Sequence, residues 1–249
     1  MEGLKFLRST QIIILGVCFV VATIVSTIIL SNGFLRIKQF SNQVISVTGS
    51  AEKKIVSDYI VWNAGFSRRD PVLKAGYNSL QEDLSAVKGY MLLNGVREDE
   101  LVISSVYTKT LYKKNEKGYD TNEIEAYELS CVVEIKSYDV ARVDNISRMS
   151  TELIDQGIRF ISSPPQFFYT RLAELKVEML AQATEDAKRR AVSMANSTNN
   201  KIGAIRSARM GVFQIIPVTS TEVSWYGEND TSSIEKKVVA VVSAVFAVE

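Results

Sequence analysis

A stripe of small residues along one helical segment limits most strongly how this chain can fold. The segment runs from Arg171 to Ser197, and apolar residues recur at every fourth position: Leu175, Met179, Ala183, Ala187, Ala191 and Ala195. Residues four apart share one face of a helix, and four of these six are alanine. Small side chains allow a helix to lie close against a flat partner, and a β-sheet is such a partner. An extended run, Ile205–Ile216, follows the helix.

The rest of the chain alternates between strand patterns and helix patterns. Strands are predicted at Val44–Thr48 (ending at Gly49), Ile55–Phe66, Leu101–Tyr112, Ile124–Lys136, Ile158–Phe168 and Val238–Val248. Amphipathic helices are predicted from the Asp70-Pro71 cap to Asn94-Gly95, and from the Asp139 cap to Gly157. The order ββαββαβαββ predicts an α+β fold with a mainly antiparallel sheet and packed helices, preceded by one N-terminal transmembrane helix.

Two strand regions carry more detailed expectations. The polar stretch Lys113–Asn122 joins two long strand patterns, which predicts a β-hairpin with Gly118 near its tip. The last run, Val238–Val248, is apolar apart from Ser243, which predicts a strand covered on both faces.

An apolar run near the N-terminus has the length of a membrane span. Ile12–Leu30 contains nineteen residues without a charge, and at about 1.5 Å per residue it reaches roughly the 30 Å of a hydrocarbon core. The anchor residues are Ile12, Leu15, Phe19, Val25 and Leu30. A signal peptide cleaved after Gly33 is the alternative, but its apolar region would exceed the usual length of about 7–15 residues. An uncleaved signal anchor fits better.

The anchor sets the expected domain organisation. We expect a short cytoplasmic segment at 1–11, the anchor at 12–30, a linker at 31–43 and one α+β domain at 44–249. Lys5 and Arg8 precede the apolar run and Arg36 and Lys38 follow it, so charge alone leaves the orientation open. We favour a single-pass protein of the bacterial cytoplasmic membrane with its bulk in the periplasm or on the cell surface.

Composition removes several classes of function. The chain has 29 basic and 28 acidic residues and no histidine. Without histidine there is no Ser-His-Asp or Cys-His catalysis and no histidine-containing metal site. A near-neutral chain without a basic tail is not expected to bind nucleic acid. Of two cysteines, Cys18 lies in the apolar run, and Cys131 has the surroundings of a small buried hydrophobe.

Two acidic groups are the remaining candidates for chemistry. Glu98-Asp99-Glu100 could bind a hard cation, but we expect it to decorate a turn. Glu123 and Glu125 lie on one face of a predicted strand and could act as acid and base, but the solvated face of a hairpin is the favoured interpretation. No catalytic residue, cofactor, metal or small-molecule substrate is therefore expected.

The loop Thr219–Asp230 is a candidate contact surface. Trp225 and Tyr226 lie beside Glu222 among polar and glycine residues. Exposed aromatic residues are favoured at protein contacts, so we hypothesise that this loop contacts a neighbouring subunit. The alternative, that Trp225 folds back onto its own domain, has equal weight.

Several short motifs, in order, resemble the SIMPL-domain family. They are Val47-Thr48-Gly49-Ser50-Ala51-Glu52, Asn94-Gly95-Val96 followed by Ile103, Tyr127 ahead of Val132-Val133-Glu134-Ile135, the pairs Ala187-Lys188, Arg190-Ala191 and Met194-Ala195, and Ile202-Gly203 before Ile205. Position 51 departs from the family pattern, with alanine in place of glycine. A turn that needed a positive φ there would have to differ.

The resemblance implies a bacterial envelope protein with an N-terminal signal or anchor. It also implies a link to oxidative-stress defence and assembly into ring- or channel-like homo-oligomers, and it supplies no catalytic residues. We therefore expect a membrane-anchored, non-enzymatic protein that associates with itself. The alternatives are a hydrolase or thiol redox enzyme of the envelope, and an oligomeric pore, although Thr23, Ser26 and Thr27 are the only polar side chains of the apolar run.

Overall fold

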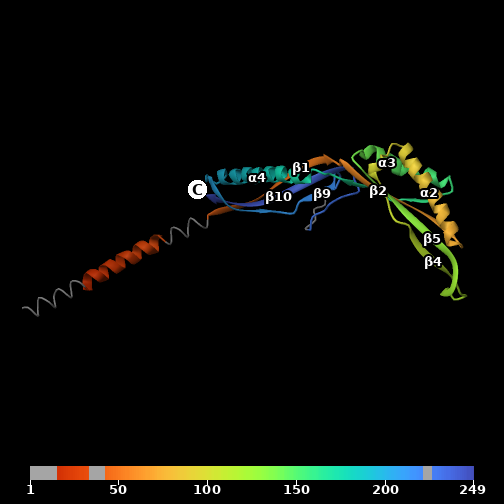
Figure 1. Ribbon diagram of the computed structural model, residues 1–249. Coiled ribbons are helices and arrows are strands. Elements are labelled where there is room, and N and C mark those ends of the chain that lie inside the picture. Colours follow the sequence, from red (N-terminus) through yellow and green to blue (C-terminus); the bar gives the residue numbers. More distant parts are fainter. Residues whose placement is uncertain (1–15, 34–42, 221–225) are drawn as a thin grey trace, which may run out of the picture. The chain divides into compact units, whose positions relative to one another are not determined.

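The chain folds into two compact units. The computed structural model describes residues 16–33, 43–220 and 226–249 (Figure 1). The first unit contains residues up to Ser50 with Gln182–Gly211 and Val241–Glu249, and the second contains Ala51–Ala181 with Val212–Ala240. An apolar helix spans Gly16–Gly33. Three elements, β1, α4 and β10, supply residues to both units.

Strands and helices follow one another in the α+β manner predicted. In chain order they are β1 (Val44–Val56), β2 (Tyr59–Asp70), α2 (Leu73–Leu93), β3 (Leu101–Ile103), β4 (Tyr107–Lys114), β5 (Asp120–Ser137), α3 (Val140–Met149), β6 (Arg159–Ser162), β7 (Gln166–Phe168), α4 (Leu172–Asn196), β8 (Ile202–Met210), β9 (Gln214–Pro217) and β10 (Glu235–Val248). Short 3-10 turns lie at Glu98–Glu100 and Ser150–Ile154.

Two sheets carry these strands. One has the order β1-β10-β8, with β9 also paired to β10, and the other has the order β3-β5-β2-β6, with β4 on β5 and β7 on β2. The β8–β10, β9–β10 and β2–β5 pairs are antiparallel, as are the pairs that β3 and β4 make with β5 and that β6 and β7 make with β2. The α+β class with antiparallel sheets is therefore confirmed.

The alanine stripe of α4 forms the core of the first unit. Ala183, Ala187, Ala191 and Ala195 are fully buried, and the middle two pack with Val47, Ala244 and Phe246 of the sheet. Figure 1 shows α4 lying along β1 and β10. A Cβ on Gly49 would lie 2.2 Å from the Ala183 carbonyl oxygen and 2.3 Å from the Ala187 nitrogen. The predicted close approach of helix to sheet is confirmed, and glycine at position 49 makes it possible.

This close approach also explains an incorrect prediction. The first strand was expected to end at Gly49, but β1 continues through it to Val56. Ala51 is extended within β1 and has no positive φ, so this position contains no turn and glycine is not required there. Gly49 therefore serves contact with α4 and does not break the strand.

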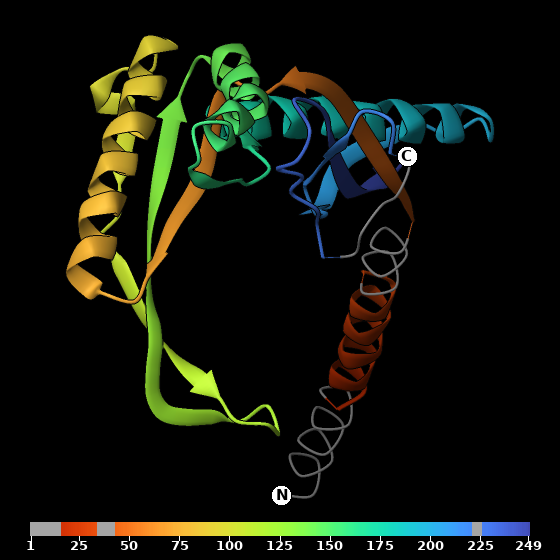
Figure 2. The same cartoon turned by 90° about the vertical axis from the view of Figure 1, so that its right-hand side faces the viewer.

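The second unit packs α2 and α3 on one face of its sheet. In β2, alternate residues are buried, among them Ile60, Trp62 and Phe66, and they meet Leu80 of α2 and Ile146 of α3. Figure 2 shows both helices beside β2 and β5. The period of two along the strand and of 3.6 along the helix together define one core.

Local details of the second unit differ from prediction at three places. Asp70 does not cap α2; its Oδ1 accepts from the Val72 nitrogen at 2.7 Å, and the helix begins after Val72. The amphipathic pattern of this helix places Tyr77 on its apolar face, but the Tyr77 side chain is 47% exposed. The predicted strand Leu101–Tyr112 divides into β3 and β4, because the Ser104 hydroxyl accepts from the Val132 nitrogen at 2.9 Å where a backbone carbonyl would otherwise pair.

Other predicted features are confirmed. Gly118 has a φ of 82° at the tip of the β4–β5 hairpin, and Asp139 caps α3 by accepting from the Arg142 nitrogen at 3.1 Å. By contrast, the single extended run predicted at Ile205–Ile216 divides into β8 and β9, which are separated by residues 211–213. In β10, consecutive residues Val238, Val239 and Ala240 are buried, as expected of a strand covered on both faces, whereas Ser243 is exposed.

Replacing Gly49 by alanine is expected to lower the free energy of unfolding by about 1–3 kcal/mol, because the added Cβ meets backbone atoms of α4 that cannot move aside. Gly65→Ala is the matched control: Gly65 is also a strand glycine, but an added Cβ meets nothing within 4 Å. Its effect should stay within about 0.5 kcal/mol. Urea unfolding followed by circular dichroism measures both, and equal effects would contradict the close contact.

Candidate functional site

The apolar helix Gly16–Gly33 has the length and composition needed to cross a membrane. None of its residues is buried, and Phe19, Val25 and Leu30 are 72%, 49% and 70% exposed. The predicted anchor residues Ile12 and Leu15 lie outside the described residues. A signal sequence passes the same test of length and composition.

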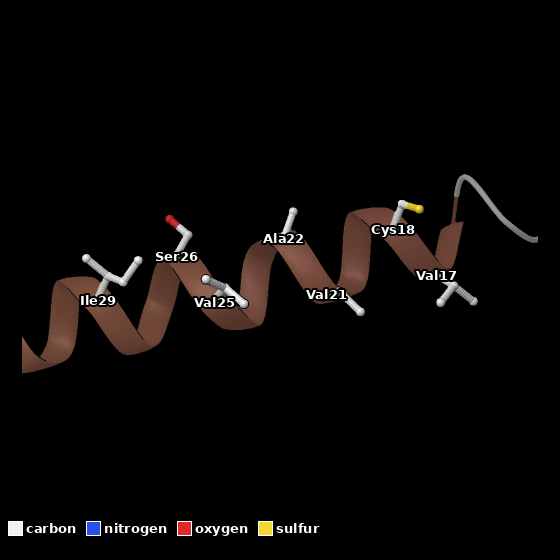
Figure 3. A pocket seen from close by; sticks show the side chains of 7 residues that line it. All are labelled: Val17, Cys18, Val21, Ala22, Val25, Ser26 and Ile29. Atoms are coloured by element: carbon white, nitrogen blue, oxygen red, sulfur yellow. The ribbon is translucent and has the colours of Figure 1, made fainter.

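Two polar side chains of this helix, Thr23 and Thr27, hydrogen-bond to the helix's own backbone. The Thr23 hydroxyl donates to the Val20 carbonyl and the Thr27 hydroxyl donates to the Thr23 carbonyl, each at 2.8 Å. Figure 3 shows small side chains, Cys18, Ala22 and Ser26, on one side of the helix, with Val17 and Val21 pointing elsewhere. The Thr23 and Thr27 hydroxyls can therefore face lipid hydrocarbon without leaving an unsatisfied hydrogen-bond donor.

A polar depression of about 600 Å³ lies in the second unit. It is lined by Ser57, Asp58, Arg97, Glu100, Tyr138, Asp139, Val140, Ala141 and Arg142. Asp58 accepts from the Thr170 nitrogen at 2.7 Å and from the Thr170 hydroxyl at 2.9 Å. Asp139 accepts from the first turn of α3, as described above. Both carboxylates are thus engaged within the fold.

Glu100 organises the floor of this depression. It is 4% exposed, and its two oxygens accept from the Ser137 hydroxyl at 2.6 Å, the Arg97 nitrogen at 3.0 Å and Arg142 Nη2 at 3.0 and 3.1 Å. Arg142 Nη1 also donates to the Gly95 carbonyl at 2.7 Å. Burial acts to raise the pKa of Glu100, but the Ser137 hydroxyl, the Arg97 amide and the two guanidinium groups outweigh it and lower the pKa. The network joins the end of α2 to the start of α3.

The acidic cluster at 98–100 does not converge on one point. Glu98 pairs with Lys88 at 3.1 Å, Asp99 pairs with Arg97 at 3.0 Å, and Glu100 is held as described. Among the residues that the structure describes, no group of three or more His, Cys, Asp or Glu side chains is placed to hold a metal ion. The cluster serves the turn between α2 and β3.

The paired carboxylates of the hairpin lie in solvent. Glu123 pairs with Lys113 at 2.9 Å and Glu125 with Arg69 at 2.6 Å, and these glutamate side chains are 72% and 49% exposed. Each has its own basic partner, so the geometry of two cooperating catalytic groups is not formed. Glu123 and Glu125 therefore lie on the solvated face of a hairpin, as predicted.

Cys131 is a buried thiol. It is 2% exposed, and its Sγ lies 3.5 Å from the Ser104 carbonyl oxygen and 3.7 Å from the Ser104 hydroxyl. A reactive thiol is partly exposed, and Cys131 is not. The interpretation as a small buried hydrophobe is confirmed.

The candidate contact loop is described in part. Glu222 and Trp225 lie outside the described residues, whereas Tyr226 is 97% exposed. The end of the loop is fixed, since the Ile215 nitrogen donates to the Glu228 carbonyl at 2.7 Å and the Asp230 nitrogen donates to the Ile215 carbonyl at 2.9 Å. The role of these three side chains in contact therefore stays a hypothesis.

Sequence reasoning missed the residue that holds this loop from within. Lys236 is 2% exposed, and its Nζ donates to the Phe167 and Asp230 carbonyls. Burial lowers the pKa of Lys236, and the Asp230 carboxylate opposes that change. The sequence carries no signal for it, because Lys236-Lys237 at the start of an apolar strand is typical of a solvated strand end.

A comparison with protein-family models finds one that covers most of the chain. The model for SIMPL, a protein of unknown function (DUF541), matches residues 45–246. The chain belongs to the SIMPL family. No curated protein matches the sequence.

The motif residues that resemble the SIMPL pattern lie where the fold needs a small or flexible residue. Gly49 contacts α4, Gly95 ends α2 with a φ of 86°, and a Cβ on Gly203 would lie 2.5 Å from the Glu249 carboxylate. Ala187 and Ala191 belong to the alanine stripe of α4. These motifs therefore account for the fold and identify no reacting group.

The Glu100 network is expected to make stability depend on pH. Because the pKa of Glu100 is lowered in the folded chain, its contribution is present above the unfolded pKa of about 4.3 and is lost as the pH falls through the folded pKa. Glu100→Gln should lower the free energy of unfolding at pH 7 by about 3 kcal/mol.

This loss should shrink as the pH approaches about 3, because protonation then removes the same charge from the unsubstituted chain. Urea unfolding at both pH values measures it. Glu98→Gln removes an exposed carboxylate of the same turn and should change stability by less than about 0.5 kcal/mol. A loss for Glu100→Gln that does not depend on pH would contradict the prediction.

Proposed function

We propose that this chain is a membrane-anchored, non-enzymatic protein of a bacterial envelope whose SIMPL domain assembles into a homo-oligomer. The observation that carries the proposal is the apolar helix Gly16–Gly33, whose apolar side chains are not buried by the rest of the chain. Exposing this much apolar surface to water is unfavourable, and a bilayer removes the cost. The SIMPL domain then faces the same side as the linker that follows the helix.

The orientation that we propose leaves the N-terminus in the cytoplasm. Lys5 and Arg8 precede the apolar run, and basic residues favour the cytoplasmic side. The SIMPL domain is then in the periplasm or on the cell surface. The same proposal includes a role in stress defence and assembly as a ring or channel. It also includes an anchor that is kept, with no cleavage after Gly33.

Anchoring supports self-assembly through concentration. Subunits confined to one membrane plane meet at a much higher effective concentration than free subunits do. Weak contacts between domains then suffice, and we propose the loop of Glu222, Trp225 and Tyr226 as one of them. The 97% exposure of Tyr226 supports this, since exposed aromatic side chains are favoured at protein contacts.

The enzymatic alternative needs a reactive group in an open cleft. Cys131 is buried, and the carboxylates of the polar depression are occupied by backbone amides, hydroxyls and guanidinium groups. The pore alternative needs polar groups turned to a lumen, whereas the hydroxyls of Thr23 and Thr27 bond to their own helix. The observations favour contact over both alternatives.

Introducing lysine at both Val21 and Val25 should release the full chain from membranes. Each charged residue near the centre of a span opposes insertion by about 2.5–3.5 kcal/mol. Membrane sedimentation followed by immunoblotting measures the change. Val21→Leu with Val25→Leu is the matched control and should remain with the membrane, and a lysine variant that stays there would contradict the anchor. The intact mass of the mature chain shows separately whether it is cleaved after Gly33.

The detergent-extracted chain should have the mass of a multimer by light scattering, and images should show a closed assembly. Trp225→Ser combined with Tyr226→Ser should reduce that mass, because contact surfaces depend on a few aromatic side chains. Tyr138→Ser, which changes another exposed aromatic residue, is the control and should leave the mass unchanged. A monomeric unsubstituted chain would refute self-assembly, whereas an unchanged mass in the double variant would refute only the loop contact.

A further inference from the structure

The β4–β5 hairpin continues beyond the sheet that supports it. Pairing of β5 with β2 ends at Tyr127, opposite Asp70, whereas pairing with β4 continues to Asp120, opposite Lys114. Figure 2 shows the hairpin extending past the ends of β2 and α2. The segment Asp120–Ala126, which we term the arm edge, therefore has β4 on one side and no described strand on the other.

The strand β8 has a second open edge. It ends the order β1-β10-β8, so within the described residues its outer side has no paired strand. Seven of its nine residues, Ala204–Met210, are exposed. An open strand edge presents unpaired backbone N–H and C=O groups and is a template for pairing with another chain. β8 and the arm edge are two of several open edges among the described strands, so their charges must decide which edges fit each other.

The charges of the two edges are opposite. The arm edge carries three carboxylates, Asp120, Glu123 and Glu125, and no basic residue. Glu123 and Glu125 already pair with Lys113 and Arg69, but both side chains are exposed, so a second basic group can share them. The β8 strand carries Arg206 and Arg209 and no acidic residue. Neither of these two guanidinium groups has an ion pair or hydrogen bond with another described side chain. Within the described part of the chain, β8 thus presents two positive charges without an ionic partner, along an edge that can accept a strand.

The spacing of the charges gives a register. Asp120 and Glu123 are three residues apart, as are Arg206 and Arg209. In an antiparallel alignment that places Asp120 opposite Arg209, Glu123 falls opposite Arg206 and Ile124 falls opposite Ile205. Residues directly opposite in antiparallel strands have Cβ atoms about 5 Å apart and interact through charge or apolar contact. Both ionic pairs and one apolar pair form in the same register.

We infer that the arm edge of one copy pairs, antiparallel, with β8 of a second copy. The inference rests on the proposed self-assembly and names the surfaces that would produce it. The other side of the hairpin does not fit β8, because β4 carries Lys109, Lys113 and Lys114 and would oppose Arg206 and Arg209. An arm edge and a β8 edge are different surfaces, so the interface is heterologous and extends into a ring or an open filament.

Charge reversal with rescue tests the pairing in the full-length, detergent-extracted chain. Arg206→Glu with Arg209→Glu should weaken association about tenfold or more, because two attractive cross-strand pairs become repulsive. Adding Asp120→Lys and Glu123→Lys to the same chain should restore the multimer. Lys74→Glu with Lys188→Glu reverses two exposed charges elsewhere and should leave association unchanged. Multimer mass against protein concentration measures all four chains.

Two outcomes of that experiment have separate meanings. A monomeric unsubstituted chain removes the proposed function and this inference together. An unsubstituted multimer that persists in the arginine variant, or a variant that the added lysines do not rescue, overturns the inference and leaves self-assembly intact. The native multimer should also weaken between about 0.1 and 1 M salt, because the screening length falls from about 10 to 3 Å.

A disulfide test decides the register and the identity of the partners. Asn122→Cys and Ser207→Cys lie opposite each other in the antiparallel register and are placed on two differently tagged copies that carry Cys18→Ala. Oxidation of the mixed proteins should link the two tags. The pair Asn122→Cys with Ala208→Cys, which faces in a parallel register, should link far less. If the parallel pair links more readily, the antiparallel register is wrong. A single chain that carries both Asn122→Cys and Ser207→Cys is the further control. If this chain forms the disulfide internally while the two tagged copies do not link, pairing between copies is overturned.

Discussion

The contact between Gly49 of β1 and the alanine stripe of α4 is the constraint on which the first unit depends. A helix resting on a sheet is normally held away by side chains, and here the Gly49 hydrogen lies where any Cβ would overlap the α4 backbone. The contact also leaves the Ser50 nitrogen free to donate to Asp186 at 3.0 Å, so one hydrogen bond joins strand and helix at the point of approach. Small residues at facing positions of both elements explain why the family motif contains glycine on one and alanine on the other.

The elements whose pattern is long and local were predictable from sequence, and contacts between distant residues were not. The periodicity of α4, the Gly118 turn and the Asp139 cap depend on neighbours in the chain, and the structure confirms each. The strand break at Ser104 depends on a nitrogen 28 residues away. The burial of Lys236 depends on the Phe167 carbonyl, 69 residues away. Neither Ser104 nor Lys236 has a sequence context that predicts its partner.

Partners that are distant in sequence also explain why clusters of charged residues did not identify a catalytic or metal site. Glu98, Asp99 and Glu100 are adjacent in sequence, yet Glu98 pairs with Lys88, Asp99 with Arg97, and Glu100 with both Arg97 and Arg142. Buried carboxylates need partners, and Glu100 obtains four hydrogen bonds from three residues. A carboxylate satisfied in this way holds elements together and is not available to exchange a proton with a substrate.

Many charged side chains within the two units have ionic partners, so the charged side chains of β8 that lack one among the described residues indicate where a second chain could bind. The arginines of β8 lie on a strand whose outer edge is unpaired among the residues that the structure describes. Open edge strands are usually protected by like charges against unwanted pairing. Positive charge protects against a neutral or positive strand, but it selects an acidic one. Confinement to a membrane plane lowers the entropic cost of meeting, so a short ionic edge can distinguish its partner without supplying a large apolar interface.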